Sequence, residues 1–401
     1  MSFQSDNLRN LSRRQFLKRA CLAAAGAAGT LSAMHSGIPV LATVEGTQGR
    51  MEYRRLGRTD LKVSAVVAGE MPAQFLHERA FELGVNYWHK MGNWALPELF
   101  AKRDRDSFYC DMVVDTLNKD GAIAQFEWGL KYSGLTMIDF IKVHSLYRVP
   151  EDVKRGEGIF QAFEYLKKRG KTRFLAVAQH VNTAEVLTAC IESGHFDAIQ
   201  PNFNVLSPKE MHGMIALAKK HDVGVICKKV LVGGERYWKK RPGLKKKVEK
   251  YLDSKTTLGQ ALLKWALATP GVTAVIPFVR NLKQLEEDVV VGFSAKASPK
   301  SGSLPDQRAL ELFAEALSND YCRSCGECIS ACPRQIAVPD ILRYTMYYVG
   351  YAQTDYARQM YRNLPKVQAA NQCNACGACE SACPHGLPIM GKLREAHALL
   401  A

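Results

Sequence analysis

Two short runs of cysteine near the end of the chain constrain its fold more than any other feature. In each run, three cysteines are separated by two residues, and a fourth follows after three residues and precedes a proline. The runs are Cys322, Cys325, Cys328 and Cys332 with Pro333, and Cys373, Cys376, Cys379 and Cys383 with Pro384. Such crowding gives poor geometry for disulfides, and zinc sites use separated pairs of ligands. The spacing predicts another kind of thiolate site.

This spacing is the signature of two-cluster bacterial ferredoxins, in which the fourth thiolate of each run binds the other cluster. We therefore predict two [4Fe-4S] clusters with crossed ligand sets. The first set is Cys322, Cys325, Cys328 and Cys383, and the second is Cys373, Cys376, Cys379 and Cys332. Clusters of this kind transfer electrons, so the upstream part of the chain is expected to donate or accept them.

The first 42 residues have the features of an export signal. The segment 12–18, SRRQFLK, resembles the twin-arginine motif. It precedes an apolar run rich in Ala and Gly, which is too short for a permanent membrane span. We predict a twin-arginine signal peptide over 1–42, the Tat export machinery as a partner and a mature chain that is periplasmic or otherwise exported, without a transmembrane span. A chance Arg-Arg pair in a disordered tail is the alternative.

The net charge of +15 narrows the choice of partners. The basic residues are not interleaved with aromatic ones as in a nucleic-acid groove, so no nucleic acid is expected as a partner. An acidic protein electron carrier fits the charge, as does an anionic surface. One basic stretch, 239–247, contains Lys239, Lys240, Arg241 and three further lysines. It is either a solvated face or a docking site for that carrier.

Residues 51–291 alternate short apolar runs with amphipathic stretches, a pattern that indicates a parallel sheet covered by helices. The predicted strands are Ser64–Ala68, Val85–Trp88, Phe108–Val113, Phe140–His144, Arg173–Ala178, Ala198–Pro201, Gly224–Cys227 and Ala274–Pro277. Eight such repeats favour an α/β fold, the (β/α)8 TIM barrel.

The remaining residues form a connection and a second domain. Residues 292–318 are predicted to be a surface connection followed by a helix. Residues 319–401 hold both cysteine runs, and the stretches Asp340–Tyr348 and Asp355–Tyr361 between them have helical patterns. We therefore expect a small α-helical ferredoxin-like domain, because a β-type ferredoxin would have a shorter insert.

The barrel region resembles the aldo-keto reductase family. The resemblance covers the opening 53–64, YRRLGRTDLKVS, then 83–88, LGVNYW, and later Ile138-Asp139-Phe140 with His144, Gln200 with Asn204, and 275–277, VIP. A branch of that family carries a helical ferredoxin domain after its barrel. The resemblance thus implies a reductase barrel joined to a two-cluster ferredoxin.

The resemblance also implies a catalytic Tyr, Lys, Asp and His, and this sequence keeps little of that set. His89 stands at the Asp position, Trp94 at the Tyr position, and Met112 or Val113 at the Lys position, while His144 matches the His. An indole cannot serve as a proton-donating acid near neutral pH. The usual carbonyl reduction is therefore not predicted, and His89 with His144 is the candidate acid/base pair.

The cofactor contacts implied by the family are altered as well. Ala178-Gln179 replaces a Ser-Asn pair, and Phe278 replaces a glycine at a place where its bulk would crowd a phosphate. Gln200 and Arg280 remain as candidate contacts for NADP(H). Hydride transfer moves two electrons and a cluster accepts one, so the two would not couple easily without a flavin. NADP(H) binding therefore stays an alternative.

The predicted function is that of an exported iron-sulfur oxidoreductase. Its two clusters would pass electrons between a protein electron carrier and a small-molecule site on the barrel rim. The rim holds several histidines, and two further interpretations of them remain. They are either ordinary polar side chains with satisfied hydrogen bonds, or the ligands of a metal ion bound by His89, His144 and His180. Two alternatives remain for the whole chain: a non-enzymatic electron-transfer or docking subunit, and an NADPH-dependent carbonyl reductase.

Overall fold

The strands form where the apolar runs predict them. The computed structural model describes residues 42–44, 47–89, 97–239, 241, 243–293 and 306–401, so 1–41 of the predicted leader lie outside it. Seven strands form one sheet in which every neighbouring pair is parallel. In chain order and sheet order they are β5 (Tyr87–Trp88), β6 (Tyr109–Val114), β7 (Phe140–His144), β8 (Phe174–Ala178), β9 (Ala198–Gln200), β10 (Gly224–Cys227) and β11 (Ala274–Val275).

Residues 65–68 close this sheet into a barrel. They pair in parallel with both edge strands, through bridges from Val66 to Val275 and from Ala68 to Trp88. The Ala68 amide donates to the carbonyl of Tyr87 at 2.9 Å, and the Val67 amide donates to that of Val275 at 3.0 Å. The predicted eight-stranded (β/α)8 TIM barrel is therefore confirmed.

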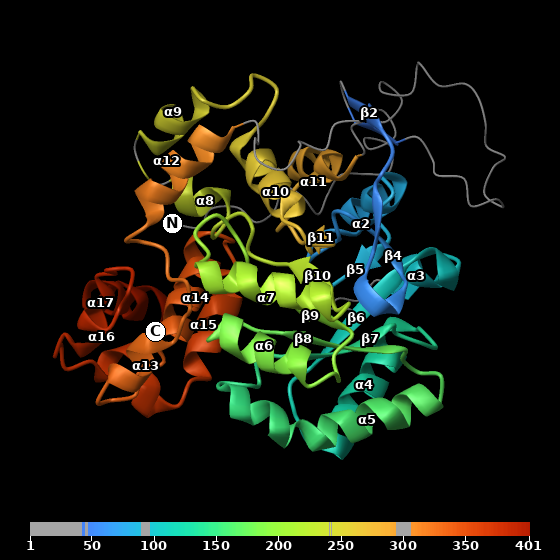
Figure 1. Ribbon diagram of the computed structural model, residues 1–401, viewed down its shortest axis with the longest axis horizontal. Helices are drawn as coiled ribbons and strands as arrows, with labels where there is room; N and C mark the ends of the chain where they lie inside the picture. Colours follow the sequence, from blue (N-terminus) through green and yellow to red (C-terminus); the bar gives the residue numbers. More distant parts are fainter. Residues whose placement is uncertain (1–41, 45–46, 90–96, 240, 242, 294–305) are drawn as a thin grey trace. The chain divides into compact units, whose positions relative to one another are not determined.

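Helices surround the barrel, one after nearly every strand, as Figure 1 shows. They are α2 (Gln74–Glu82), α3 (Pro97–Ala101), α4 (Lys119–Ser133), α5 (Glu157–Lys168), α6 (Thr183–Glu192), α7 (Lys209–Lys220), α10 (Leu258–Ala268) and α11 (Leu282–Val289). Two short helices, α8 (Glu235–Lys239) and α9 (Leu244–Glu249), are inserted after β10. Local signals set the ends of α4, where Asn118 caps the first turn and Gly134 stops the helix with a left-handed φ of 70°.

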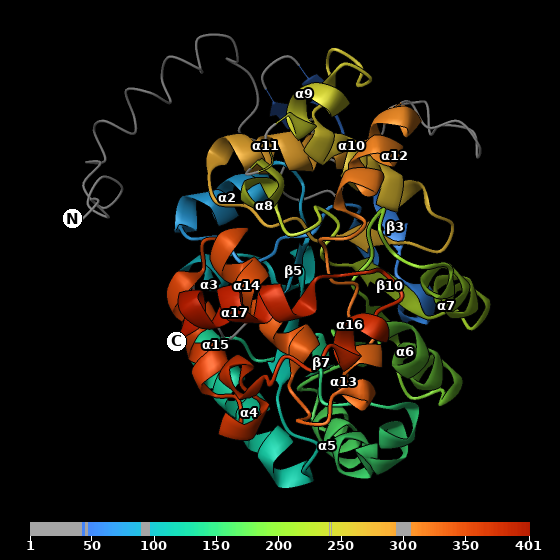
Figure 2. The ribbon, with the colours of Figure 1, turned by 90° about the vertical axis from the view of Figure 1, so that its left-hand side faces the viewer.

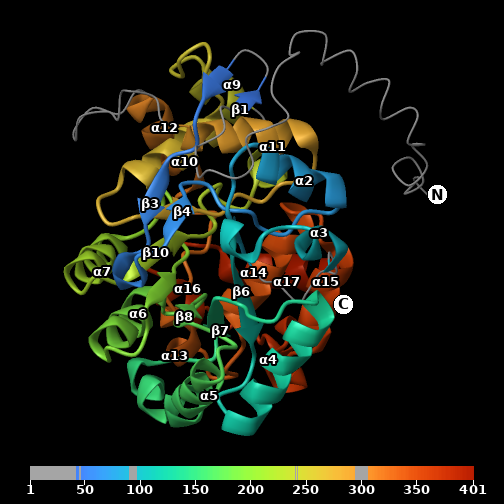
Figure 3. The ribbon, with the colours of Figure 1, turned by 90° about the vertical axis from the view of Figure 1, so that its right-hand side faces the viewer.

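A hairpin closes the amino-terminal end of the barrel. It consists of β3 (Tyr53–Arg55) and β4 (Lys62–Ser64), and Figure 3 shows it on the side away from the last helices of the chain. A further hairpin, β1 (Ala42–Val44) with β2 (Thr47–Gly49), precedes it. Leu56, between β3 and β4, is fully buried in a cluster with Tyr87 and Phe140. This end of the barrel is therefore packed with apolar side chains, and chemistry can take place only at the other end.

The C-terminal region is helical, as predicted. Its helices are α12 (Gln307–Leu317), α13 (Glu327–Ala331), α14 (Val338–Val349), α15 (Thr354–Arg362), α16 (Ala378–Ser381) and α17 (Ile389–Leu400). The cysteine runs lead into α13 and α16, and α14 packs against both α15 and α17. No helix among the described residues is long and apolar enough to cross a membrane.

These last helices cover the carboxyl ends of the barrel strands, and Figure 2 looks through them onto the barrel. The ring of Tyr351 stacks on Phe278 with centroids 4.4 Å apart, and the Gln353 amide donates to Glu70 at 3.1 Å. The closest approach is between Gly350 and Gly233, where a Cβ on Gly350 would lie 1.9 Å from the Gly233 carbonyl oxygen. The two regions are thus in van der Waals contact and belong to one compact unit.

Candidate functional site

A buried polar cluster lies inside the barrel near its mouth. Side chains alternate along a strand, so Lys142 and His144 of β7 both point inward, as do Asp111 of β6 and Gln200 of β9. Lys142, Asp111 and Gln200 are fully buried. The Lys142 ammonium donates to Asp111, to His89 Nδ1 at 2.7 Å and to Gln200 Oε1 at 3.1 Å. All three of its hydrogens therefore have acceptors.

This arrangement fixes the charge of Asp111 and the tautomer of His89. Burial alone would raise the pKa of Asp111, but the adjoining Lys142 ammonium is the main cause that lowers that pKa well below its usual value. Asp111 is therefore a carboxylate, and it also accepts hydrogen bonds from Tyr87 at 3.0 Å and Gln200 at 2.9 Å. Because His89 Nδ1 accepts from Lys142, the proton of a neutral His89 ring lies on Nε2, on the far side of the ring from Lys142.

A cavity of about 90 Å³ lies at the barrel mouth next to this cluster. His89, His144 and His180 line it from three different strand ends, together with Glu70 and Lys228. The structure thus brings the two predicted acid/base residues, His89 and His144, to one cavity. Its volume has room for a group of only a few atoms, since a cavity of about 150 Å³ holds benzene.

A second hydrogen-bonded chain orients His144. His180 Nδ1 donates to Asn202 Oδ1 at 3.2 Å, so its Nε2 accepts from His144 Nε2 at 3.0 Å. Burial, followed by the positive charge of Lys228 and Arg343, lowers the pKa of His180 well below its usual value. His180 is therefore neutral near pH 7, which suits its role as the acceptor for His144.

The C-terminal region supplies the other wall of this small cavity. Tyr347, Tyr351, Gln353 and Tyr356 line it from α14, α15 and the turn that joins them. The Lys229 ammonium lies 4.3 Å from the ring centroid of Tyr347 and 4.5 Å from that of Tyr351, at cation-π distance. Lys229 has a left-handed φ of 59°, a conformation that few non-glycine residues adopt.

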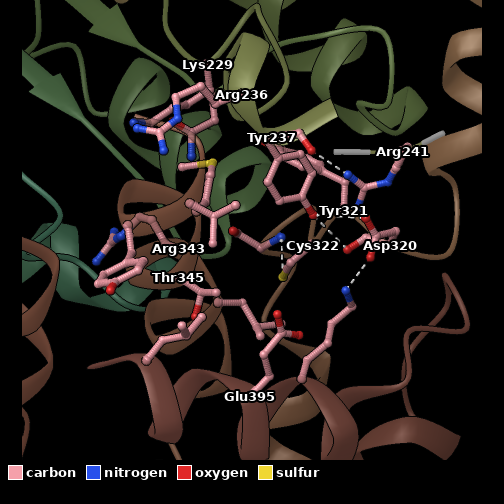
Figure 4. A pocket seen from close by; sticks show the side chains of 18 of the residues that line it. Lys229, Arg236, Tyr237, Arg241, Asp320, Tyr321, Cys322, Arg343, Thr345 and Glu395 are labelled. Atoms are coloured by element: carbon pink, nitrogen blue, oxygen red, sulfur yellow. Dashed lines mark hydrogen bonds and ion pairs between the residues drawn. The ribbon is translucent and has the colours of Figure 1, made fainter. Parts of the chain in front are cut away.

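A larger cavity, of about 610 Å³, lies between the barrel and the C-terminal region. Barrel residues Asn202 and Lys229 line it together with Arg236 and Arg241 from the segment after β10. Cys322, the first cysteine of the first run, lines it from the opposite side (Figure 4). Lys229 also lines the small cavity, so one residue borders both spaces.

The cysteines group as the crossed assignment expects. All eight are free thiols. Cys322, Cys325, Cys328 and Cys383 line one narrow space together. Burial is the largest cause of the raised pKa of Cys379, and Cys332 and Cys373 are next, so these two thiols are its close neighbours. Each of these two groups combines cysteines of both runs, and the ligand sets, including Cys376 in the second, stay a prediction.

The described cysteine side chains do not converge on the position of a single metal ion. Among the described residues, no three His, Cys, Asp or Glu side chains converge on one metal position. In a [4Fe-4S] cluster each thiolate binds a different iron, so the four sulfurs need not converge on a point. The same finding leaves the metal alternative at His89, His144 and His180 without support.

Several other predicted positions lie elsewhere. Gln200 is enclosed by Lys142 and Asp111, and the Arg280 guanidinium bonds the Tyr351 carbonyl. Neither lines the small cavity, and their nicotinamide role stays a prediction. Trp94 lies outside the described residues.

Sequence reasoning missed Lys142, which forms the centre of the buried cluster. A signal for it was present, because Lys142 stands two residues before His144 within an otherwise apolar predicted strand. The period of a strand places both residues on the inner face of the barrel. The tyrosines of the C-terminal wall were also missed, since no local pattern connects them with the barrel.

Comparison with known proteins agrees with this two-part architecture. Residues 101–298 match the Aldo/keto reductase family, and residues 321–387 match the 4Fe-4S dicluster domain. The match to the Aldo/keto reductase family begins after His89, so His89 lies outside the matched residues. The holo form of aldo-keto reductase AKR11C1 from Bacillus halodurans is 19% identical, with a TM-score of 0.54 over 65% of this chain and 96% of that chain. Its apo form is 19% identical, with a TM-score of 0.53 over 66% and 97%.

At this identity the solved structures establish the fold of the barrel and nothing more. The family matches add the nature of the two parts, and together they account for the barrel and both cysteine runs. The chain therefore contains an aldo/keto reductase domain and, at its C-terminal end, a 4Fe-4S dicluster domain.

Proposed function

We propose that this protein is an exported iron-sulfur oxidoreductase that acts on a small molecule at the covered mouth of its barrel. One observation carries the proposal: Cys322 lines the same cavity as Asn202 and Lys229 of the barrel. A predicted cluster ligand and the barrel mouth thus border a common space, where a substrate would lie next to both.

The cysteine residues fit two [4Fe-4S] clusters. Four thiols border one narrow space, none of the eight forms a disulfide, and the Ser324 amide lies 3.4 Å from Cys322 Sγ, where it can stabilise a thiolate. Each cluster, when bound, accepts and donates one electron. The remaining roles belong to the chain, which must admit the substrate, exclude water and move protons.

Acid/base work is assigned to His89 and His144. Both line the small cavity, and each is held by a defined partner on its other side, Lys142 for His89 and His180 for His144. A neutral His89 carries its proton on Nε2, where it can donate to a substrate. Such a positioned imidazole is the commonest general acid in enzymes.

The arrangement around Phe278 supports a reaction without nicotinamide. Tyr351 covers the Phe278 ring, and its carbonyl accepts from Arg280. Two of the positions at which the family resemblance implies cofactor contacts, Phe278 and Arg280, are therefore in contact with the C-terminal region. A cavity of about 610 Å³ next to the barrel also favours an enzyme over a docking subunit.

Electrons are proposed to come from an acidic protein carrier. Lys245, Lys246 and Lys247 of α9 are exposed and form a basic surface. Such a surface raises the association rate of an acidic partner at low salt. Reduction of the protein by a negatively charged ferredoxin should therefore slow as salt rises, and an unchanged rate would remove this role from α9.

The direct test is an anaerobic titration of the full-length holoprotein. Dithionite should bleach the visible absorbance of the clusters, while NADPH should leave the absorbance unchanged and show no enhanced nicotinamide fluorescence. Bleaching by NADPH would instead establish the reductase alternative. Clusters that dithionite cannot reduce would contradict an electron-transfer function of any kind.

Export has its own test. Replacing Arg13-Arg14 by Lys-Lys should keep the protein in the cytoplasm, with its clusters intact, because the twin-arginine pathway reads these two residues. The unchanged chain, fractionated in parallel, is the control. Normal export of the Lys-Lys variant would overturn the assignment of residues 1–42 as a twin-arginine signal.

A further inference from the structure

The charges that line the large cavity are predominantly positive. Five cationic and two acidic side chains border it. The cationic ones are Lys229, Arg236, Arg241, Arg343 and Lys392, and the acidic ones are Asp320 and Glu395. A cavity of this size, about 610 Å³, lies within the usual range for small-molecule sites.

Two of these cations share one acidic partner. Arg241 and Lys392 both pair with Asp320, which lies near Cys322 in Figure 4. Lys392 also interacts electrostatically with Cys322, so it can offset the charge of a thiolate there. This side of the cavity is therefore close to neutral and is explained by the cysteine site.

The other three cations are Lys229, Arg236 and Arg343. In the view of Figure 4 they are drawn to the left of Cys322, whereas Arg241 and Asp320 are drawn to its right. Arg236 is exposed and has no ion-pair partner among the described residues. Arg343 pairs with Asp340 through one nitrogen at 2.6 Å.

The remaining nitrogens of Arg343 carry the strongest indication of a ligand. Its Nε and Nη1 atoms are buried and donate to no acceptor among the described residues. Buried N–H groups without acceptors are rare, because each costs the desolvation of the group. A buried guanidinium in this condition needs an acceptor, and an anionic oxygen is the strongest one available.

We propose that the large cavity binds a small organic anion, a carboxylate or a phosphate ester, through Arg343, Arg236 and Lys229. Given the proposed function, this anion is the substrate. Lys229 borders both cavities, so the charged end occupies the large cavity while the reacting group reaches His89 and His144 in the small one. Neither residue of that histidine pair is needed for binding of the charged end.

Binding can be measured by calorimetry on the anaerobic, oxidised, full-length holoprotein. Succinate probes the carboxylate class and glycerol 3-phosphate the phosphate class, with succinamide and glycerol as their neutral counterparts. One of the two anions should bind and its neutral counterpart should not. Arg236→Gln and Arg343→Gln should each weaken binding by about tenfold or more, since each removes a charge-assisted hydrogen bond.

Arg394→Gln is the matched control, because it removes the same charge from an exposed position on α17 that does not line the cavity. It should leave the Kd unchanged. Arg236 is exposed, so its variant is expected to fold, which iron content and circular dichroism would verify. Arg236→Lys should restore part of the affinity.

Two results would overturn the proposal. One is that neither anion binds at millimolar concentrations. The other is that Arg236→Gln and Arg343→Gln bind as tightly as Arg394→Gln, which would assign the cations to offsetting cluster charge. Because the clusters stay oxidised throughout, the outcome is independent of turnover. Binding without any later reoxidation of reduced clusters would refute the proposed function and leave the anion site standing.

Discussion

The two cysteine runs have nearly the same backbone and very different surroundings. Ser324 and Ala375 occupy equivalent positions and share a left-handed φ of 57°. Two residues later, Gly326 and Gly377 are left-handed as well, with φ of 95° and 81°. This repeated backbone conformation is what three closely spaced thiolates require, so the local sequence dictates the same loop twice.

The first run lies against the barrel, whereas the second is open to solvent. The Asn182 amide of the barrel donates to the Ser324 carbonyl at 2.8 Å, and Arg323 Nε donates to the Leu206 carbonyl at 2.6 Å. At the equivalent places in the second run, Asn374 and Ala375 are exposed. The comparison teaches that one loop conformation can be placed against the barrel in the first run and toward solvent in the second, so the neighbouring segments and not the loop set the surroundings of the thiols.

The largest expected effect is on iron content. Cys328→Ser and Cys379→Ser should each lose about half of the iron, one cluster of two. In the unchanged protein, iron release to a chelator should be biphasic, because only the second run exposes a cysteine. The Cys379 variant should keep the slow phase alone, and the Cys328 variant the fast phase alone. Equal rates of iron release in the two variants would contradict the difference in exposure between the two runs.

The barrel side of the comparison depends on the polar cluster around Lys142. Lys142→Met leaves the Asp111 carboxylate buried without its ammonium and should lower the free energy of unfolding by about 3–5 kcal/mol. Urea unfolding of the anaerobic holoprotein measures this. Lys220→Met, at an exposed position of α7, should stay within about 0.5 kcal/mol. A second change, Asp111→Asn, should recover part of the loss.

A paired substitution at equivalent positions of the two runs compares them directly. Arg323→Gln breaks hydrogen bonds to the carbonyls of Leu206 and Ser318 and should cost about 1.5–3 kcal/mol of unfolding free energy. Asn374→Gln, in the exposed second run, should change it by less than about 0.5 kcal/mol. Similar losses in both variants would mean that the barrel contact does not distinguish the runs.

The smallest effect concerns pH. Burial and nearby cations lower the pKa of His180 in the folded state, so the unfolded chain binds its proton first. The free energy of unfolding should therefore fall as pH drops below the usual histidine value, by about 1–2 kcal/mol between pH 6.5 and 5. His180→Gln should remove this part of the slope, and His195→Gln, at an exposed residue, should not. An unchanged slope in His180→Gln would contradict a neutral buried imidazole.

The elements of this fold could be predicted because they depend on local patterns. The pattern of apolar residues located the strands of the barrel. Two of them, Phe140–His144 and Gly224–Cys227, have the bounds expected from the sequence. Both cysteine runs were identified by spacing alone. The crossed ligand sets followed from the same spacing and remain to be tested by iron content.

The site was harder to predict because it forms between distant segments. Lys142 meets Asp111 only after β6 and β7 pair, and Arg343 reaches the barrel mouth only after α14 docks on it. The contact between Gly233 and Gly350 joins residues more than a hundred positions apart, and no periodicity records such a contact. The family resemblance was also of no help here, since it concerns the barrel and not the surface that covers it.

The shared cavity has a consequence for how the protein matures. One wall comes from the barrel and the other from residues 320–399, which follow the barrel in the chain. If the proposed substrate site is this cavity, the barrel alone has only one of its walls, and a chain that lacks iron has no fixed anchor for Cys322 on the opposite wall. Under the proposed function, substrate binding would report that cofactor insertion is complete, so a molecule without clusters would not begin a reaction that it has no electrons to finish.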